Sequence, residues 1–347
     1  MKSRMFLFVL TVMLAALARD VRTARAADAV VGNGTPASCT EAAFDSALAT
    51  ANAGGGTITF KCGANPKTIA LTVIKVVNLA SVTIDGGNRI ILKAGNNERH
   101  FFAGSGITFQ LRNITLRDGN SLVSGGAIEA SGATVSLRNV QLLDNASAVT
   151  GGAIYCFDGA LTIANSLLKN NTAPDLGGAI YNDGCALTIS GSTFQGNQAR
   201  DGGGLFNAIG GQAVLDAVTF AANTGGYGGG IENSGVVTVT NGIFDGNSVK
   251  GSGGALWNLG GTAILQRTTV SNNRAFEGGG INSYGNHLQL TDVNIVDNVA
   301  TGTHGGGIYH AGGTMHSLRM PRSATIRQAT QLPTAAASIR TQTITWS

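Results

Sequence analysis

The chain contains little proline, few aromatic residues and little charge. Only 5 of its 347 residues are proline, aromatic residues make up 6%, and charged residues make up 12%. Disordered chains are enriched in proline and charge, so this composition excludes a disordered linker. The 51 glycines do not occupy every third position, which excludes collagen. Glycine that recurs at a longer interval predicts a repeat protein.

Long apolar runs are also scarce, and the one that exists lies at the N-terminus. Met5–Ala18 is mainly apolar and follows Lys2 and Arg4. The run is shorter than the roughly 20 residues of a membrane-spanning helix, and Ala24–Ala26 forms a small-x-small cleavage site. We therefore predict a signal peptide over residues 1–26 and a mature chain without a transmembrane span. An uncleaved membrane anchor is the alternative.

Net charge differs along the chain. Residues 1–26 carry five Lys or Arg and one Asp, and residues 314–347 carry four Arg and no acid. Since the whole chain has a net charge of +4, residues 27–313 carry 14 basic and 18 acidic residues, a net −4. Scattered acids of this kind do not attract nucleic acid or an anionic membrane, so neither is a predicted partner.

A motif of two glycines, a small residue and an aliphatic residue recurs eight times. The aliphatic residues stand 25 to 27 positions apart, at Ile128, Ile154, Ile180, Leu205, Ile231, Leu256, Ile281 and Ile308. Between the copies lie alternating runs that end in an apolar residue, two variable residues and asparagine. These asparagines are Asn145, Asn171, Asn197, Asn223, Asn247, Asn273 and Asn298, and a shorter column comprises Asn182, Asn207, Asn233 and Asn258.

The alternation predicts strands, because successive side chains of a strand point to opposite faces. Between residues 57 and 313, glycine interrupts every window with helical spacing, and the period is shorter than the roughly 40 residues of a propeller blade. We therefore predict an all-β fold, a single-stranded right-handed parallel β-helix (a solenoid of about 11 coils) over residues 57–313. The aliphatic residues should point inward, the paired glycines should form corners, and the asparagines should form ladders.

A cap is expected over residues 27–56. Thr40–Ala53 predicts a short helix with Thr40 as its N-cap and Gly54 as its stop. Of the four cysteines, Cys39 and Cys62 are the favoured disulfide, which would tie the cap to the first coil. Cys156 and Cys185 form either a second disulfide or two buried free thiols.

The motifs resemble a known repeat. Gly-Gly-Ala-Ile occurs at residues 125–128, 151–154 and 177–180, and Phe-x-x-Asn occurs at residues 194–197, 220–223 and 244–247. This pattern resembles the repeats of the chlamydial polymorphic outer membrane proteins (Pmp). The resemblance implies a pectate-lyase-like β-helix and a surface-displayed adhesin or passenger domain. No counterpart of that family's C-terminal translocator barrel is recognised, so the resemblance does not imply how this chain is anchored.

Chemistry-bearing residues are sparse. When the acidic residues are assigned to equivalent positions of the repeat, none of the positions compared carries acids on two adjacent coils. We therefore interpret six acids as solvated turn residues without catalytic function: Glu129, Asp158, Asp175, Asp201, Glu232 and Glu277. His304, His310 and His316 are six residues apart, match no metal-ligand spacing and are read as surface histidines. No catalytic residue, metal site or cofactor is predicted.

One repeat position is rich in aromatic residues. The residue after the inward aliphatic is aromatic at Tyr155, Tyr181, Phe206, Trp257 and Tyr309, and Glu129, Glu232 and Asn282 interrupt the series. If the aliphatic points inward, this neighbour points outward. We therefore predict a ligand-contact strip suited to sugar rings or a partner protein. The alternative is that turns or loops cover these rings.

These features predict an exported bacterial β-helix protein that is secreted or associated with the outer membrane at the cell surface. Its expected function is that of an adhesin-like binding scaffold without catalysis, with a glycan or a host or neighbouring-cell surface protein as partner. The alternatives are a polysaccharide lyase or glycoside hydrolase acting on an acidic polysaccharide, and a broken gene product. Residues 314–347 lack glycine and acids and are predicted to be an atypical tail, either disordered or out of frame.

Overall fold

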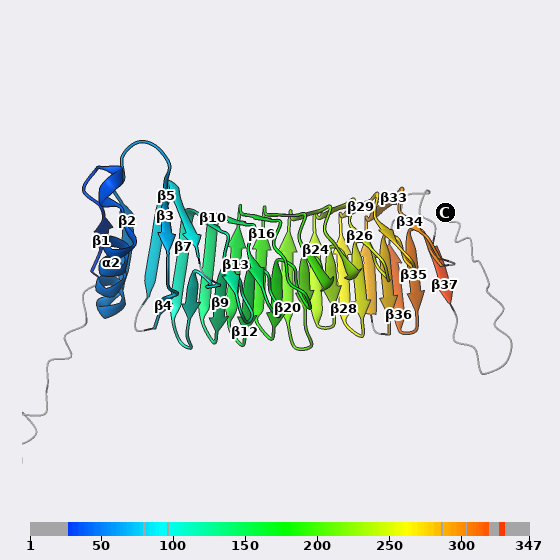
Figure 1. The fold of residues 1–347 in the computed structure, drawn as a ribbon. Coiled ribbons are helices and arrows are strands. Elements are labelled where there is room, and N and C mark those ends of the chain that lie inside the picture. The colour runs from blue at the N-terminus through cyan, green and yellow to red at the C-terminus, as the bar shows by residue number, and fades with distance from the viewer. Residues whose placement is uncertain are drawn as a thin grey trace, which may run out of the picture.

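The protein is a parallel β-solenoid. The computed structural model describes residues 27–78, 81–95, 97–285, 287–302, 304–318 and 326–329. Their strands stack side by side along one axis in about 11 turns, which confirms the predicted fold class (Figure 1). Within these residues, no helix is long and apolar enough to cross a membrane. The predicted signal peptide lies outside the described residues.

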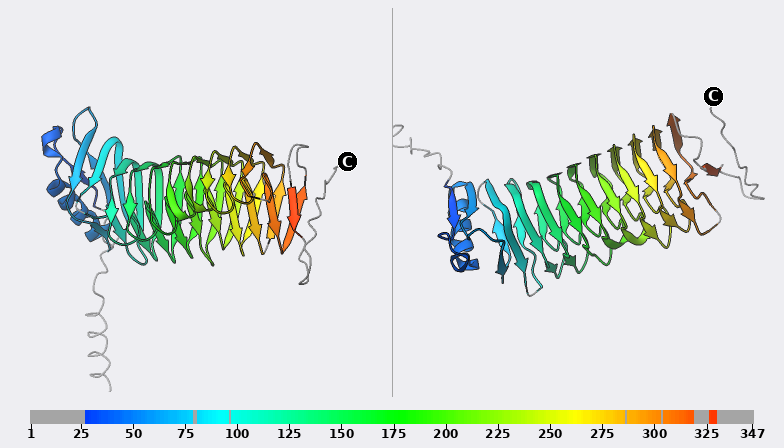
Figure 2. Two further views of the ribbon diagram at one scale, coloured as in Figure 1. Left: turned by 45° about the vertical axis from the view of Figure 1, so that its right-hand side comes forward. Right: turned by 90° about the horizontal axis from the view of Figure 1, so that it is seen from above.

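Three faces of parallel strands run along the solenoid (Figure 2). The first sheet comprises β1 (Ala29–Val31), β2 (Gly56–Phe60), β3 (Lys67–Leu71), β5 (Val82–Ala94), β7 (Thr108–Arg117), β10 (Thr134–Leu143), β13 (Ala160–Ala164), β14 (Leu167–Lys169), β16 (Ala186–Ser190), β17 (Thr193–Gln195), β20 (Gln212–Asp216), β21 (Thr219–Ala221), β24 (Val236–Thr240), β25 (Ile243–Asp245), β28 (Thr262–Gln266), β29 (Thr269–Ser271), β32 (His287–Thr291), β33 (Asn294–Val296) and β36 (Thr314–Leu318). The second sheet comprises β4 (Lys75–Val77), β6 (Phe101–Ala103), β9 (Ile128–Ser131), β12 (Ile154–Phe157), β15 (Ile180–Asp183), β19 (Leu205–Asn207), β23 (Ile231–Asn233), β27 (Leu256–Leu259), β31 (Ile281–Tyr284), β35 (Ile308–Ala311) and β37 (Ile326–Ala329). The third sheet comprises β18 (Gln198–Asp201), β22 (Thr224–Tyr227), β26 (Ser248–Val249), β30 (Arg274–Ala275) and β34 (Val299–Ala300), and the short pair β8 (Asn120–Ser121) and β11 (Ala146–Ser147) leads into it.

The register of the second sheet follows the sequence repeat. Each aliphatic of the glycine motif pairs with the equivalent residue of the next coil, as Ile154 pairs with Ile180. The six aliphatics predicted to share one inner column are at most 1% exposed: Ile154, Ile180, Leu205, Ile231, Leu256 and Ile281. This inner column is therefore confirmed, and its stacked side chains form part of one continuous hydrophobic core.

The two glycines of each motif have different functions. Gly177 has a φ of +66°, which an L side chain rarely adopts, and it turns the chain into the second sheet. Gly178 has no such φ, but a Cβ there would overlap the carbonyl oxygen of Gly203 on the next coil. The first glycine is therefore needed for its positive φ, and the second is needed because the backbones of neighbouring coils lie too close for a side chain.

Buried asparagines form a ladder where the first sheet turns into the third. Asn197 donates from Nδ2 to the carbonyl of Leu168 and to Oδ1 of Asn223, both at 2.9 Å. Its own Oδ1 accepts from the backbone N–H and from Nδ2 of Asn171, again at 2.9 Å. The same pattern repeats along the column from Asn145 to Asn298. The second column is a ladder too, with Asn207 donating to Asn233 at 2.7 Å.

A helical cap covers the N-terminal end. Helix α2 (Glu41–Gly54) begins after Thr40, whose side chain accepts from the backbone N–H of Ala43 at 3.2 Å. Lys75 is only 2% exposed, and its Nζ lies 2.6 Å from carboxylate oxygens of both Glu41 and Asp45. Burial by itself raises the pKa of Glu41, but hydrogen bonds from Lys75 and Thr72 lower that pKa to about 2. This ion cluster fixes the cap to the first coils.

Two disulfides are present. Cys39 bonds to Cys62 with a Cα–Cα distance of 5.6 Å, the pairing that the sequence favours. Cys156 bonds to Cys185 with a Cα–Cα distance of 6.1 Å, which the sequence leaves open. The short 3-10 helix η1 (Pro36–Ser38) leads into the first of these bridges.

Removing the Cys39–Cys62 bridge should free the cap. The bridge spans 23 residues, so the double substitution C39A/C62A should lower the free energy of unfolding by about 2–4 kcal/mol through loop entropy. Urea denaturation followed by circular dichroism measures the change. An unchanged midpoint under non-reducing conditions would show that the bridge does not hold the cap.

The solenoid continues beyond residue 313. Strand β36 pairs with β32, and β37 pairs with β35, both in parallel register. These strands fall within the segment for which the sequence predicts an atypical tail, residues 314–347. The other residues of that segment lie outside the described residues.

Candidate functional site

Three of the five predicted aromatic residues form a contiguous group on the second sheet, which we call the ring strip: Tyr155, Tyr181 and Phe206. The rings of Tyr155 and Tyr181 stack with centroids 5.5 Å apart, and Phe206 meets Tyr181 edge-on at the same distance. The hydroxyl of Tyr155 donates to Asp183 at 3.2 Å. All three side chains are half-buried, so each presents only part of its ring to solvent.

The other two predicted aromatics lie apart from the ring strip. Trp257 stacks on Tyr227, with ring centroids 4.4 Å apart, and Tyr309 packs against His304 at 4.8 Å. Both are also half-buried. Tyr227 comes from the third sheet, and its position before the glycine corner gave no sign of this contact. The five residues therefore do not form one continuous strip.

Glu232 is the residue that separates Phe206 from Trp257, and its interpretation as a solvated acid is wrong. It pairs with both aromatic neighbours in the sheet register and is only 3% exposed. Its Oε2 has no hydrogen-bond partner among the described residues. Burial, reinforced by the nearby charge of Asp201, raises the pKa of Glu232 to about 9, although Arg200 opposes the shift. The carboxyl is therefore protonated at neutral pH.

Replacing this carboxyl by an amide should stabilise the protein above pH 5. Between pH 4.5, the ordinary pKa of glutamate, and about 9, only the unfolded chain ionises Glu232. The free energy of unfolding of the native sequence should therefore fall as pH rises through this window. We expect E232Q to be about 1–3 kcal/mol more stable at pH 8 and equally stable near pH 4. Urea titrations at the two pH values measure this, and an equal effect at both would contradict the buried protonated state.

Acids do occur on adjacent coils, contrary to the sequence interpretation. Asp118 and Asp144 follow the paired residues Arg117 and Leu143, so they occupy the same turn position one coil apart. Arg117 lies 3.1 Å from Asp118 and 3.7 Å from Asp144 and bridges them. The comparison of repeat positions missed this pair because it did not include the turn before the asparagine ladder, where the two acids lie.

The remaining predicted turn acids are mostly paired. Glu129 pairs with the buried Arg99, and Glu277 lies 2.9 Å from His304. Arg200 lies between Asp175 at 2.8 Å and Asp201 at 3.1 Å. These four acids therefore have basic partners within the protein. Asp158 is exposed, as predicted.

Of the three histidines, His310 is not on the surface. It is 1% exposed, and burial lowers its pKa. His304 is half-buried against Tyr309, and His316 is exposed. Among the described residues, no group of three or more His, Cys, Asp or Glu side chains is placed to hold a metal ion.

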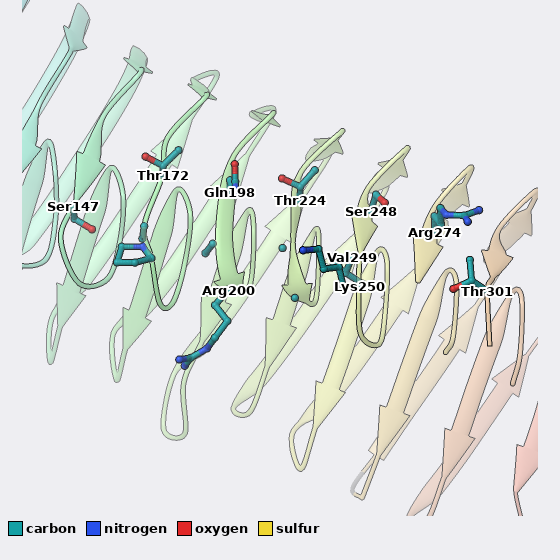
Figure 3. A pocket seen from close by; sticks show the side chains of 15 residues that line it. Ser147, Thr172, Gln198, Arg200, Thr224, Ser248, Val249, Lys250, Arg274 and Thr301 are labelled. Atoms are coloured by element: carbon teal, nitrogen blue, oxygen red, sulfur yellow. The ribbon is translucent and has the colours of Figure 1, made fainter. Parts of the chain in front are cut away.

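An elongated groove with a volume of about 1040 Å³ follows the third sheet (Figure 3). It is lined by Ser147, Thr172, Ala173, Pro174, Gln198, Ala199, Arg200, Thr224, Gly225, Gly226, Ser248, Val249, Lys250, Arg274 and Thr301. None of these 15 described residues is acidic or aromatic. We call this the third-sheet groove.

The lining of the third-sheet groove includes a column of polar side chains, one from each coil. Thr172, Gln198, Thr224, Ser248 and Arg274 are register partners in successive coils. Coils are about 4.8 Å apart, so the column offers hydrogen-bonding groups at that interval. Sequence reasoning missed it because the third-sheet strands have two to four residues and show no hydrophobic alternation.

The architecture defines the protein as a parallel β-solenoid with ordered asparagine ladders and an outer polar groove. The Chlamydia polymorphic membrane protein repeat matches residues 165–183, so the chain contains a repeat of the kind that its sequence resembles. That match runs from β14 through the asparagine turn and the glycine corner to the end of β15. Among curated proteins, none matches the chain significantly.

Two solved structures match the chain. PfbA, a surface adhesin of Streptococcus pneumoniae, matches with a TM-score of 0.47 and 13% identity, over 90% of this chain and 96% of its own. ORF18 of Geobacillus virus E2 matches with a TM-score of 0.37 and 13% identity, over 87% of this chain and 60% of its own.

Proposed function

We propose that this protein is an exported scaffold that binds an extended partner along its outer face and does not act on it chemically. The observation that carries this proposal is the third-sheet groove. Five coils in succession each contribute one polar side chain of this column to its lining. A groove built in this way suits a ligand that runs parallel to the solenoid axis, such as a glycan chain or an extended segment of a surface protein.

The lining of the groove supports binding without catalysis. Hydrolysis of a glycosidic bond needs two carboxyl groups on either side of the bond. The groove lining contains no carboxyl group, and the buried carboxyl of Glu232 is too enclosed to meet a polymer. The groove can therefore supply hydrogen bonds and positive charge to a ligand but no acid–base pair.

Export to the cell surface or the medium is the second part of the proposal. It is supported by the signal-like residues 1–26 and by the match to a repeat whose name denotes membrane proteins. The two disulfides agree with an oxidising compartment. We propose the ring strip as a second contact surface, because partly exposed stacked rings suit sugars or a protein partner.

One observation favours the alternative of a polysaccharide lyase or hydrolase. Asp175 and Asp201 flank Arg200 at the edge of the groove, which places two carboxylates beside a positively charged side chain. All three charges are engaged with one another, however, and among the described residues no group of three or more acidic, His or Cys side chains is placed to hold a metal ion. We therefore place binding first.

The test is retention of the labelled full chain on a glycan array and on intact bacterial and host cells. We expect saturable retention on at least one glycan or cell type. Y181A should weaken retention if the ring strip takes part, and V236A, an exposed apolar position on the first sheet, serves as its control. Absence of retention on every surface would refute the scaffold proposal.

A further inference from the structure

The third-sheet groove carries positive charge that the protein itself does not neutralise. Arg200 is engaged by Asp175 and Asp201. Lys250 and Arg274 are exposed, and neither forms an ion pair with any side chain that the structure describes. In a segment of net charge −4, two unpaired cations in one groove are a local exception that attracts negative charge.

The two cations lie on neighbouring coils beside the polar column. Arg274 is the register partner of Ser248, and Lys250 follows Ser248 by two residues on the same coil. A ligand that runs along the groove therefore meets hydroxyl and amide groups on three coils, followed by positive charge on the next two. Arginine and lysine bind carboxylate and sulfate groups with short, charge-assisted hydrogen bonds.

The chemistry of the groove favours a carbohydrate over a nucleic acid. Proteins that bind single-stranded nucleic acid stack its bases on aromatic side chains, and the groove lining has none. Hydroxyl and amide side chains repeated once per coil suit instead a polymer with many hydroxyl groups along its length. Acidic groups at intervals along such a polymer would satisfy Lys250 and Arg274.

We propose that the third-sheet groove binds a linear acidic glycan, with Thr172, Gln198 and Thr224 contacting sugar hydroxyls and with Lys250 and Arg274 contacting carboxylate or sulfate groups. This assignment rests on the proposed binding function and names its ligand class. The glycan lies parallel to the solenoid axis. Its affinity falls as salt rises, because exposed charges are screened.

The experiment compares two polymers that share a backbone and differ in charge, polygalacturonate and its fully methyl-esterified form. Binding to the full chain is measured by isothermal titration calorimetry at low and moderate salt. K250Q/R274Q should weaken polygalacturonate binding about tenfold or more. The control R138Q/K169Q removes the same charge from β10 and the end of β14 on the first sheet and should leave binding unchanged. Both pairs are solvent-accessible, so neither double substitution should impair folding.

The outcomes separate this inference from the function on which it rests. Equal binding of the two polymers, or equal loss in the two double variants, would overturn the acidic-glycan assignment while leaving a scaffold that binds by other means. Absence of binding to both polymers would also overturn it, and the glycan array then decides the scaffold proposal separately. Equal affinity for single-stranded DNA would show a general polyanion site and would overturn the glycan class.

Discussion

Replacing Asn197 by alanine should lower the free energy of unfolding by about 4 kcal/mol. The substitution removes the acceptor for the backbone N–H and the Nδ2 of Asn171, and it removes the donor to the carbonyl of Leu168. All these groups are buried in the turn between the first and third sheets, and each unsatisfied group costs about 1–3 kcal/mol. Urea denaturation followed by far-ultraviolet circular dichroism measures the loss.

The matched control for this prediction is N120A. Asn120 is exposed, and its side chain donates one hydrogen bond, to Asn97 at 3.0 Å. Its replacement should change the free energy of unfolding by no more than about 0.5 kcal/mol, as is usual for surface positions. If N197A and N120A proved equally mild, the asparagine ladder would be a consequence of the fold rather than one of its main stabilising elements.

Replacing Gly178 by alanine should be at least as damaging, at about 4 kcal/mol or more. The added Cβ would overlap the carbonyl oxygen of Gly203 and lie 2.6 Å from the backbone nitrogen of Gln198. These are backbone atoms of the next coil, so the clash cannot be relieved by a side-chain rotation. The two coils would have to separate, which breaks the hydrogen bond from Gly178 N–H to the carbonyl of Gly202.

The control for this clash is G104A. At Gly104 the nearest atom to an added Cβ is Cε1 of Phe102 at 3.6 Å, an ordinary contact, and no positive φ is needed. The substitution should be neutral, or stabilising by a few tenths of a kcal/mol, because alanine restricts the unfolded chain. Thermal denaturation of both variants compares the two effects. A mild G178A would show that the coils tolerate wider spacing than the structure indicates.

The sequence was sufficient to predict the solenoid because its main constraints repeat in register. A residue such as Ile180 must meet its equivalents, Ile154 and Leu205, above and below, so a period of about 25 residues translates directly into one inner column. The asparagine ladder follows from the same logic. One favoured disulfide was predicted from its place in the cap, while the second stayed open because pairing across coils depends on register in detail.

The candidate site was harder to predict because it depends on contacts between different repeat positions. Glu232 is buried by its register neighbours Phe206 and Trp257 and by the glycine corner beside it, where Gly228 approaches its Cβ. No single column of the repeat contains that environment. The third-sheet groove was missed for a similar reason, since its strands are too short to show a hydrophobic period. Comparing equivalent positions of the repeat identifies columns within one sheet, but it does not reveal a contact between sheets such as that of Trp257 with Tyr227.

The most direct test of the central claim combines binding with the integrity of the ligand. The full chain is incubated with polygalacturonate and with the best ligand from the array, with and without calcium. Retained polymer is then eluted, and its chain length is measured by size-exclusion chromatography. We expect retention of a polymer of unchanged length, with no new reducing ends and no unsaturated products. Shortening of the polymer by the native chain, lost on substitution of Asp175, Asp201 or Glu232, would contradict a non-catalytic scaffold and identify an enzyme.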